Sequence, residues 1–233
     1  MTSDKLTFYT NKGCPYAQRV AIALKALNLP HDHVEIDLDN KPEWYPKINP
    51  ETKVPALAIN DTILTESLVI AEYLLEQYPS TLYPTTPLAR AQTRFFITLF
   101  TDKVNAKTGA LQWSGVFGPA LDDLKKDQLV KELFAGVRQV NSWLSANSGA
   151  GPFATGEKPG FADVALGPFL LRLPVFTAIT GVEIPEGVEY DRFHQWVRAV
   201  QEWDAAKDTF PGVEVIVGRV QEKIAKVKTA QAQ

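Results

Sequence analysis

A proline-rich segment, residues 79–87, divides the chain into two parts of different character; it reads Pro-Ser-Thr-Leu-Tyr-Pro-Thr-Thr-Pro. Proline fixes φ and removes a backbone donor, so prolines at this density interrupt helices and indicate a linker. Strand and helix signals alternate before the segment, whereas only helical spacings follow it. With 233 residues the chain has room for two domains. We predict an α/β domain over residues 1–80, a linker over 81–90 and an all-α domain over 91–233.

The α/β part has the predicted order β-α-β-α-β-β-α. The expected elements are a strand at 6–9, a helix from Pro15 to about residue 28, a strand at 33–38, a short helix or turn at 42–45, a hairpin over 56–64 and a helix from Ser67 to Tyr78. We expect the first β-α-β unit to be parallel and right-handed, with the hairpin completing a small mixed sheet.

The all-α part is predicted from apolar residues that recur at helical spacing. The expected helices cover residues around 95–100, 121–144, 161–176, 192–203 and 213–227. The strongly apolar segment 161–176 is expected to form one buried helix. Because its apolar run from Gly167 to Leu171 stops at Arg172, far short of the ~20 residues of a membrane span, we expect no membrane association.

The composition excludes several classes of function. There are 24 Lys and Arg against 27 Asp and Glu, and a net charge of −3 gives no reason to expect a nucleic-acid partner. The N-terminus lacks the apolar stretch of a signal peptide, so we expect a cytoplasmic protein. The single cysteine excludes an intrachain disulfide, a cysteine-rich zinc site and a two-thiol redox motif. The three histidines show no metal-ligand spacing, and we expect no bound metal.

The one cysteine, Cys14, lies at a predicted strand-to-helix turn, with Pro15 at the first helical position. A helix N-terminus presents unpaired N–H groups and about half a positive charge, which favour thiolate over thiol. We therefore predict that Cys14 has a lowered pKa and acts as a nucleophile. The alternative is a small buried apolar residue, because free cysteines are often buried.

Two further candidate sites flank the predicted hairpin. At Val54–Pro55, a cis peptide bond would turn the Val54 backbone outward to pair with an extended peptide, although the trans form is commoner. At Glu66–Ser67, the helix start and the Ser67 hydroxyl could hold a ligand carboxylate, with a ligand ammonium on Glu66. The simpler interpretation is that Ser67 is only an N-cap. All three sites fall at one edge of the predicted sheet, where ligands commonly bind.

Together these motifs resemble the cytosolic glutathione transferases over nearly the whole chain, and within them the omega class, which has cysteine where other classes have tyrosine or serine. The motifs are Cys14-Pro15-Tyr16-Ala17-Gln18-Arg19, Asn40-Lys41-Pro42-Glu43-Trp44-Tyr45, Asn49-Pro50, Lys53-Val54-Pro55, Glu66-Ser67 and Glu72-Tyr73-Leu74. The resemblance implies a thioredoxin-like N-terminal domain followed by an all-helical C-terminal domain. It also implies a homodimer and glutathione bound along the first domain.

By the same resemblance, Cys14 is the catalytic residue and forms a mixed disulfide with glutathione. The implied glutathione-binding residues are Tyr16, Lys41, Lys53, Val54, Pro55, Glu66 and Ser67. Where the family begins a helix with Ser or Thr, this chain has Gly160. Glycine caps nearly as well as threonine, so Asp163 is expected to keep a structural role.

The second substrate is expected between the two domains. The candidate wall residues are Trp113, Phe117, Phe169, Arg172, Leu173 and Phe176, with ordinary core packing as the alternative for each. The implied function is glutathione-dependent thiol transfer or reduction, whether deglutathionylation or reduction of dehydroascorbate or glutathione conjugates, with weak activity towards aryl halides. The partners are then glutathione and a hydrophobic or glutathionylated small molecule. The alternative function is a ligandin-type binding protein for hydrophobic aromatic compounds.

Overall fold

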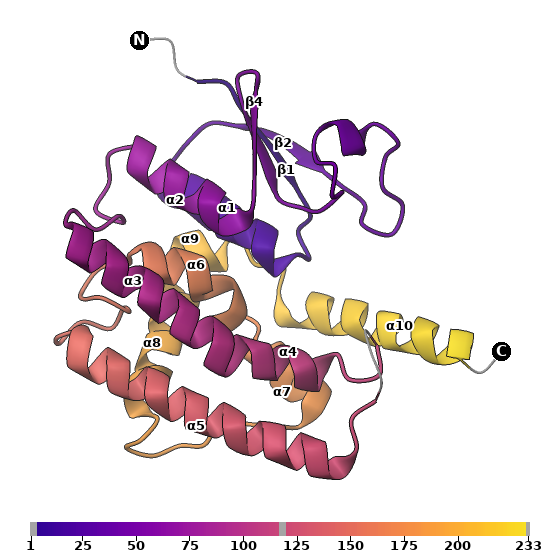
Figure 1. The fold of residues 1–233 in the computed structure, drawn as a ribbon, viewed down its shortest axis with the longest axis vertical. Coiled ribbons are helices and arrows are strands. Elements are labelled where there is room, and N and C mark those ends of the chain that lie inside the picture. The colour runs from indigo at the N-terminus through magenta and orange to yellow at the C-terminus, as the bar shows by residue number, and fades with distance from the viewer. Residues whose placement is uncertain (1–3, 117–119, 232–233) are drawn as a thin grey trace.

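A four-stranded mixed sheet organises the first part of the chain in the computed structural model, which describes residues 4–116 and 120–231 (Figure 1). The strand order is β2-β1-β3-β4, with β1 at Leu6–Thr10, β2 at Asp32–Glu35, β3 at Ala56–Ile59 and β4 at Thr62–Thr65. Strands β1 and β2 are parallel, whereas β1 with β3 and β3 with β4 are antiparallel. The predicted parallel β-α-β unit and the hairpin are confirmed, although β2 is shorter than the strand predicted over 33–38.

Two helices, α1 (Pro15–Ala26) and α2 (Ser67–Gln77), lie side by side against this sheet. Alternate residues of β1 are buried, as the period of a strand requires. Phe8 and its register partner Leu57 are both buried, at 1% and 0% exposure. A short 3-10 helix, η1 (Tyr45–Lys47), supplies the predicted turn before β3. The sheet and the two helices make the thioredoxin-like half of the predicted fold.

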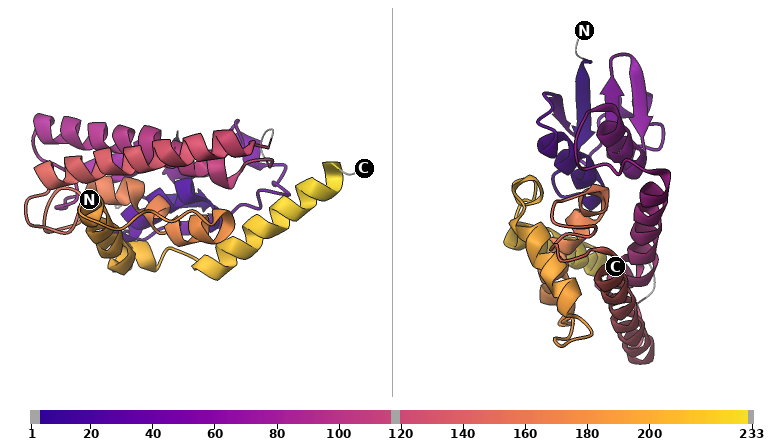
Figure 2. Two further views of the ribbon diagram at one scale, coloured as in Figure 1. Left: turned by 90° about the horizontal axis from the view of Figure 1, so that it is seen from below. Right: turned by 90° about the vertical axis from the view of Figure 1, so that its left-hand side faces the viewer.

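The rest of the chain is helical in the residues that the structure describes. The elements are α3 (Pro87–Phe100), the π-helical turn η2 (Thr101–Asn105), α4 (Ala106–Gln112), α5 (Asp123–Asn147), α6 (Phe161–Leu170), α7 (Leu173–Thr180), α8 (Asp191–Glu202), α9 (Asp204–Lys207) and α10 (Val213–Gln231). Figure 2 shows α5 alongside α3 and α4. Helix α3 begins inside the segment expected as a linker, because the Thr86 hydroxyl caps it by accepting from Ala89 N (3.2 Å) and Pro87 needs no N–H at that position.

Helix α6 forms the seam between the two domains. It packs against α1 and α2 of the first domain and against α3 and α8 of the second. All of its residues except Phe169 are buried. Gly167 allows this close packing, since an added Cβ would lie 3.3 Å from Val200 Cγ1 and 3.5 Å from Ile22 Cδ1.

The prediction of one helix over 161–176 is wrong, because the chain breaks at Leu171 and Arg172 into α6 and α7. Pro174 has no N–H to offer the Leu170 carbonyl, which accepts instead from Gln201 Nε2 (3.3 Å). The Pro168 carbonyl likewise accepts from Arg172 Nη1 (2.8 Å). The break places Arg172 at the domain seam.

By length and composition, the 20-residue segment Phe161–Thr180 is apolar enough to cross a membrane, because an 18-residue window within it has a mean hydropathy of 1.5. The expectation that no apolar segment approaches that length is therefore wrong. In this fold the segment is divided between α6 and α7, and 61% of that 18-residue window is buried inside the protein. Its apolar character is accounted for by core packing.

Candidate active site

Cys14 is the N-cap residue of α1, at the end of a tight turn that follows β1. The Cys14 N–H donates to Asn11 O (2.9 Å), and the Gly13 N–H donates to Asn11 Oδ1 (2.9 Å). The partly buried thiol donates to the Val54 carbonyl, with Sγ 3.8 Å from the oxygen. The turn therefore directs the thiol towards the loop that precedes β3.

The Val54–Pro55 peptide bond is cis, the rarer of the two forms considered from the sequence. The loop before it is held at the Lys53 carbonyl, which accepts from the Tyr45 hydroxyl (2.7 Å) and from Asn49 Nδ2 (2.8 Å). Val54 is 8% exposed, and Pro55 is buried beside it. This corner and the cysteine are neighbours in space although 40 positions separate them in the chain.

The start of α2 lies at the same edge of the sheet. Glu66 is exposed and has φ 67°, a left-handed conformation that is uncommon for residues with a side chain. Ser67 is the first residue of α2 and makes no capping hydrogen bond, so the N-cap interpretation is wrong. The buried Ser67 hydroxyl oxygen accepts instead from Arg19 Nη1 (3.1 Å). The hydroxyl proton can then be donated to an acceptor such as a ligand carboxylate.

Arg19 links α1, α2 and the helical domain, and it is 4% exposed. Besides its bond to Ser67, its Nε donates to the Ala165 carbonyl of α6 (2.7 Å). Its guanidinium lies over the rings of Tyr16 and Phe169, 5.3 and 4.9 Å from their centroids. Burial lowers the pKa of Arg19 to about 10, so the side chain stays charged at neutral pH.

Arg172 approaches the cysteine turn from the helical domain. Its Nη1 donates to Gln18 Oε1, and its Nη2 donates to the Gly13 carbonyl (3.3 Å), one residue before Cys14. Burial lowers the pKa of Arg172 to about 10 as well. Two charged guanidinium groups from different elements therefore face the thiol.

The predicted lowering of the Cys14 pKa is wrong in direction. Burial raises the pKa of the Cys14 thiol, and the N–H groups of Ala17 and Tyr16 together with Arg172 and Arg19 offset only part of that rise. The helix N-terminus acts as expected, but the packing of the thiol at the domain seam outweighs it. The thiol form therefore predominates at neutral pH, and the reactive thiolate fraction increases as the pH rises.

The other predicted glutathione residues extend along the edge. Tyr16 is 48% exposed, and its ring meets that of Phe169 edge-on, with centroids 5.6 Å apart. Lys41 and Lys53 are exposed, with Lys41 Nζ donating to Thr52 Oγ1 (3.2 Å) and Lys53 paired with Glu51 (2.6 Å). Both lysines thus have surface partners that a ligand carboxylate must replace or share.

The second-substrate candidates separate into three groups. Two of them lie against α1, namely Phe169 and Arg172. Trp113 packs against a small apolar cluster between α7 and α10, whereas Phe176 and Leu173 pack in the main core, with Phe176 only 2% exposed. Phe117 lies outside the described residues. Core packing therefore accounts for the apolar character of Phe176 and Leu173. Phe169 and Arg172 remain candidates at the site.

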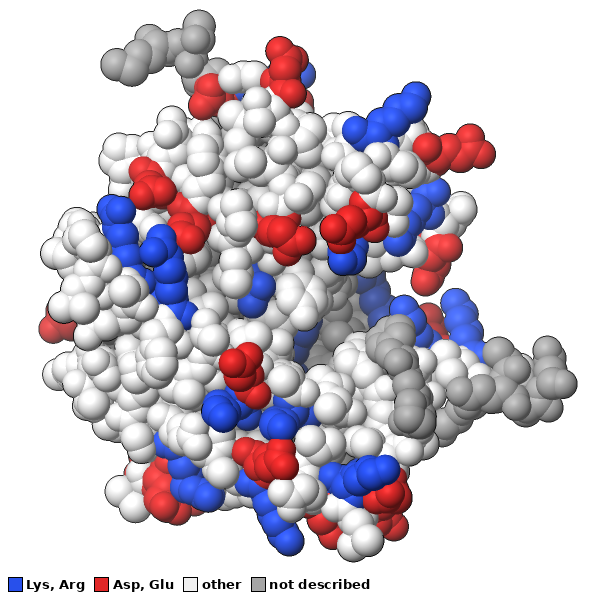
Figure 3. Space-filling view, viewed as in Figure 1, with Lys and Arg blue, Asp and Glu red and all other residues white. Residues whose placement is uncertain are grey.

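Arg219 of α10 also belongs to this site, and the sequence analysis did not predict it. A Cβ added at Gly13 would lie 2.7 Å from Arg219 Nη1, so the guanidinium covers the turn before Cys14. Figure 3 shows a hollow between the sheet domain and α10, with basic side chains on its walls. Only the fold could reveal Arg219, whereas Arg19 is detectable as a charged residue among the apolar positions of a buried helix.

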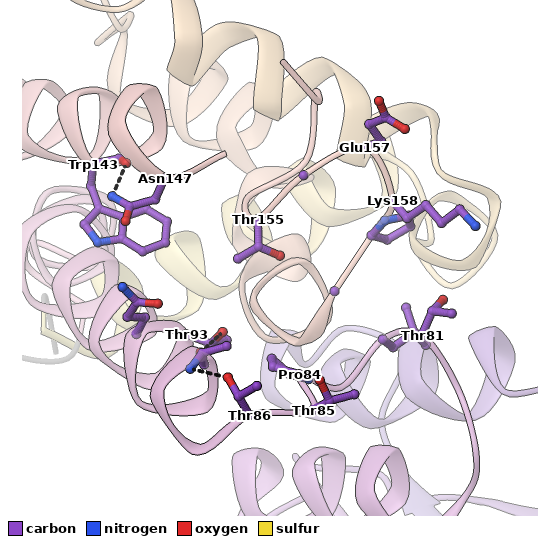
Figure 4. Close-up of a pocket in the computed structure, with 16 residues that line it drawn as sticks. Thr81, Pro84, Thr85, Thr86, Thr93, Trp143, Asn147, Thr155, Glu157 and Lys158 are labelled. Carbon is purple, nitrogen blue, oxygen red and sulfur yellow. Dashed lines mark hydrogen bonds between the residues drawn. The ribbon is translucent and has the colours of Figure 1, made fainter. Parts of the chain in front are cut away.

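A second cavity, of about 660 Å³, lies at the other end of the domain seam (Figure 4). Its walls come from the linker, the start of α3, the end of α5 and the loop before α6, and they are rich in threonine: Thr81, Thr85, Thr86, Thr93 and Thr155. Neither Cys14 nor any predicted glutathione residue lines it. This cavity is separate from the candidate active site.

The histidines have partners of their own. His31 Nδ1 lies 2.9 Å from Leu29 O, and His194 Nε2 lies 2.9 Å from Pro185 O. Among residues 4–116 and 120–231, no group of three or more His, Cys, Asp or Glu is placed to hold a metal ion. The groups around Cys14 are backbone, hydroxyl and guanidinium groups, which suit thiol chemistry on an anionic peptide.

Residues 8–82 match the glutathione S-transferase N-terminal domain family, and residues 127–199 match the glutathione S-transferase C-terminal domain family. The chain is 36% identical to glutathione S-transferase omega-1 of Mus musculus over 206 residues, which is 85% of this chain and 77% of that protein. The chain belongs to the glutathione transferase family. Its thioredoxin-like domain and helical domain are those of a glutathione transferase, as predicted.

This glutathione transferase has relatives in several classes. Pyrimidodiazepine synthase of Drosophila melanogaster is 46% identical over 100 residues, 41% of each chain. Glutathione S-transferase DHAR3, chloroplastic, of Arabidopsis thaliana is 32% identical over 162 residues, 70% of this chain. The matched regions span 41% and 55% of the lengths of these two relatives.

Solved structures that are similar to this chain are also glutathione transferases of more than one class. The tau-class transferase from mango has a TM-score of 0.83 at 25% identity, covering 94% of this chain and 98% of that one. Glutathione transferase Omega 1C from Trametes versicolor has a TM-score of 0.79 at 29% identity, covering 96% and 98%. The similarities thus include omega, tau and DHAR proteins alike.

Proposed function

We propose that this glutathione transferase is a glutathione-dependent thiol transferase of the omega type, with Cys14 as its nucleophile. The observation that carries the proposal is the position of the thiol, at a helix N-terminus, 3.8 Å from the Val54 carbonyl and facing two charged guanidinium groups. Relatives named as omega and DHAR transferases support it. Transferases that carry out conjugation use a tyrosine or serine hydroxyl to stabilise the glutathione thiolate. In this proposal Cys14 takes that place, and its thiol can bond covalently to glutathione.

In this proposal glutathione lies along the edge of the sheet domain. The Val54 backbone pairs with its cysteinyl residue, and the Ser67 hydroxyl donates to its γ-glutamyl carboxylate while Glu66 takes the ammonium. Arg19, which is charged and bonded to Ser67, reinforces the preference for a carboxylate there. The glycyl carboxylate reaches Lys41 and Lys53, and Tyr16 lines the site.

The reaction has two exchange steps. The Cys14 thiolate attacks the glutathionyl sulfur of a mixed disulfide, the sulfur–sulfur bond breaks, and the second thiol leaves as a thiolate that takes up a proton. A glutathione thiolate then attacks the glutathionyl sulfur on Cys14, which releases oxidised glutathione and restores the Cys14 thiolate. Because the chain has one cysteine, the second reducing equivalent must come from glutathione.

The proposal predicts a specific pattern of activity. With glutathione, the purified protein reduces hydroxyethyl disulfide at least about tenfold faster than it conjugates chlorodinitrobenzene, because the thiol bonds to glutathione instead of stabilising its thiolate. Both rates are measured spectrophotometrically at saturating glutathione. Rapid aryl conjugation without disulfide reduction would refute the proposed thiol transfer while leaving the family membership intact.

We also propose a cytoplasmic homodimer. Exposed apolar side chains on neighbouring helices support an interface there, with Val69 of α2 55% exposed and Leu88 and Phe95 of α3 70% and 58% exposed. The Arg94–Glu72 ion pair (2.5 Å) holds the two helices together.

A ligandin role for hydrophobic aromatic compounds stays a prediction.

A further inference from the structure

Three guanidinium groups from three different elements surround the turn that carries Cys14. Arg19 lies on α1 itself, and Arg172 bonds the Gly13 carbonyl from the break between α6 and α7 (3.3 Å). Arg219 reaches the same glycine from α10, with its Nη1 2.7 Å from the position of a Cβ at Gly13. Three elements thus bring positive charge to one turn.

None of these three arginines forms an ion pair within the described part of the chain. The bonds of Arg19 go to a carbonyl and a hydroxyl, and those of Arg172 go to two carbonyls and an amide. Arg219 is exposed and has no hydrogen bond or carboxylate partner among the described residues. Buried cations are normally paired, so Arg19 and Arg172 bring positive charge to this turn that the protein itself does not neutralise, and the exposed Arg219 adds to it.

The proposed glutathione position leaves part of this charge unmatched. Glutathione's carboxylates lie towards Ser67 and the surface lysines, on the sheet-domain side of Cys14, where Arg19 also contributes. Arg172 and Arg219 come from the helical domain and meet at Gly13 on the other side. With glutathione in that position, the thiol half of the substrate that departs when Cys14 attacks would approach from the Gly13 side.

We propose that Arg219, backed by Arg172, selects second substrates whose thiol half carries a carboxylate close to its sulfur. This inference rests on the proposed thiol transfer and names its preferred substrate class, anionic glutathione mixed disulfides. In the first exchange the carboxylate-bearing thiolate departs beside two guanidinium groups, and Cys14 keeps the glutathionyl group. Attraction at this turn stabilises the bound carboxylate of the substrate, a charge that a neutral or cationic thiol half does not offer.

Three mixed disulfides of glutathione test the inference, with mercaptopropionate, mercaptoethanol and cysteamine as the anionic, neutral and cationic partners. For Arg219→Ala we expect kcat/KM to fall roughly fivefold for the anionic substrate, to stay within about 1.5-fold for the neutral one and to rise for the cationic one. The ratio of the wild-type kcat/KM to the variant kcat/KM is taken for each substrate separately. This ratio cancels the differences in pKa among the three leaving thiols. Added salt reduces the anionic preference of the wild type.

Arg198→Ala is the matched control, because Arg198 is an exposed arginine of α8, beside a different surface hollow, and its loss changes the net charge equally. We expect it to alter none of the three values, and we expect Arg219→Lys to keep most of the preference. If Arg219→Ala lowers all three values alike, or none, the inference is overturned and thiol transfer stands. If the wild type reduces none of the three substrates, thiol transfer itself fails.

Discussion

Replacing Cys14 with serine is expected to lower disulfide reduction by at least about 1000-fold, because the hydroxyl cannot form a disulfide with glutathione. The bond that the first exchange step forms is absent in the variant, so raising the glutathione concentration does not restore the rate. The measurement is kcat/KM for hydroxyethyl disulfide in the coupled assay with glutathione. The effect is large because the chain has no other cysteine to substitute for Cys14.

Two controls separate this loss from a folding defect. The serine variant keeps the urea midpoint of the wild type, since serine is similar in size and can donate to the Val54 carbonyl as the thiol does. It also keeps its affinity for glutathione, because the proposed contacts to Val54, Glu66 and Ser67 are unchanged. Full retention of disulfide reduction in a folded Cys14→Ser protein would rule out Cys14 as the nucleophile.

Replacing Asp163 with alanine is expected to lower the free energy of unfolding by about 3–5 kcal/mol. Asp163 is fully buried at the start of α6, where its carboxylate accepts from the backbone N–H groups of Gly160 (2.8 Å) and Ala154 (3.1 Å) and from Trp196 Nε1 (2.6 Å). Alanine leaves three buried donors without a partner at the domain seam. The structure thus confirms the structural role expected for Asp163.

Asp122 provides the matched comparison, because it is also an aspartate at a helix start. Its Oδ1 accepts from Lys125 N (2.8 Å), but its side chain is 59% exposed, so Asp122→Ala should lower the free energy of unfolding far less than Asp163→Ala. Asp163→Asn keeps one acceptor oxygen, so its loss of stability should lie between the losses of the two alanine variants. Urea unfolding at constant temperature gives all three values. Equal losses for the two alanine variants would contradict the buried network as the source of the effect.

Local signals in the sequence were sufficient for most elements of the fold. Alternation in the first strand, the proline after Cys14 and the polar turn of the hairpin are short-range features, and each corresponds to an element of the structure. The proline-rich segment marks the change from sheet to helices, but α3 starts within it, at Pro87. Prolines both end and begin helices, so their density locates a boundary only to within several residues.

The electrostatics of the site depend on contacts that no local pattern records. Arg19 bonds a carbonyl 146 positions away, and Arg172 bonds one 159 positions away. The same long-range packing buries the Cys14 thiol and raises its pKa, against the local effect of the helix N-terminus. A local argument gives the direction in which the helix N-terminus shifts the pKa of Cys14. The direction of the total shift depends on burial, which only the fold determines.

Mass spectrometry of the purified protein after incubation with oxidised glutathione tests the central claim most directly. The account predicts one glutathione per chain, mapped to Cys14 by peptide analysis and removed by reduced glutathione. Because burial raises the pKa of the thiol, the adduct should form faster as the pH is raised from about 7 to about 9. The urea-unfolded chain serves as a check that the reagent is competent. If the unfolded chain acquires the adduct and the folded protein remains unmodified throughout this pH range, the proposed mixed disulfide on Cys14 is contradicted.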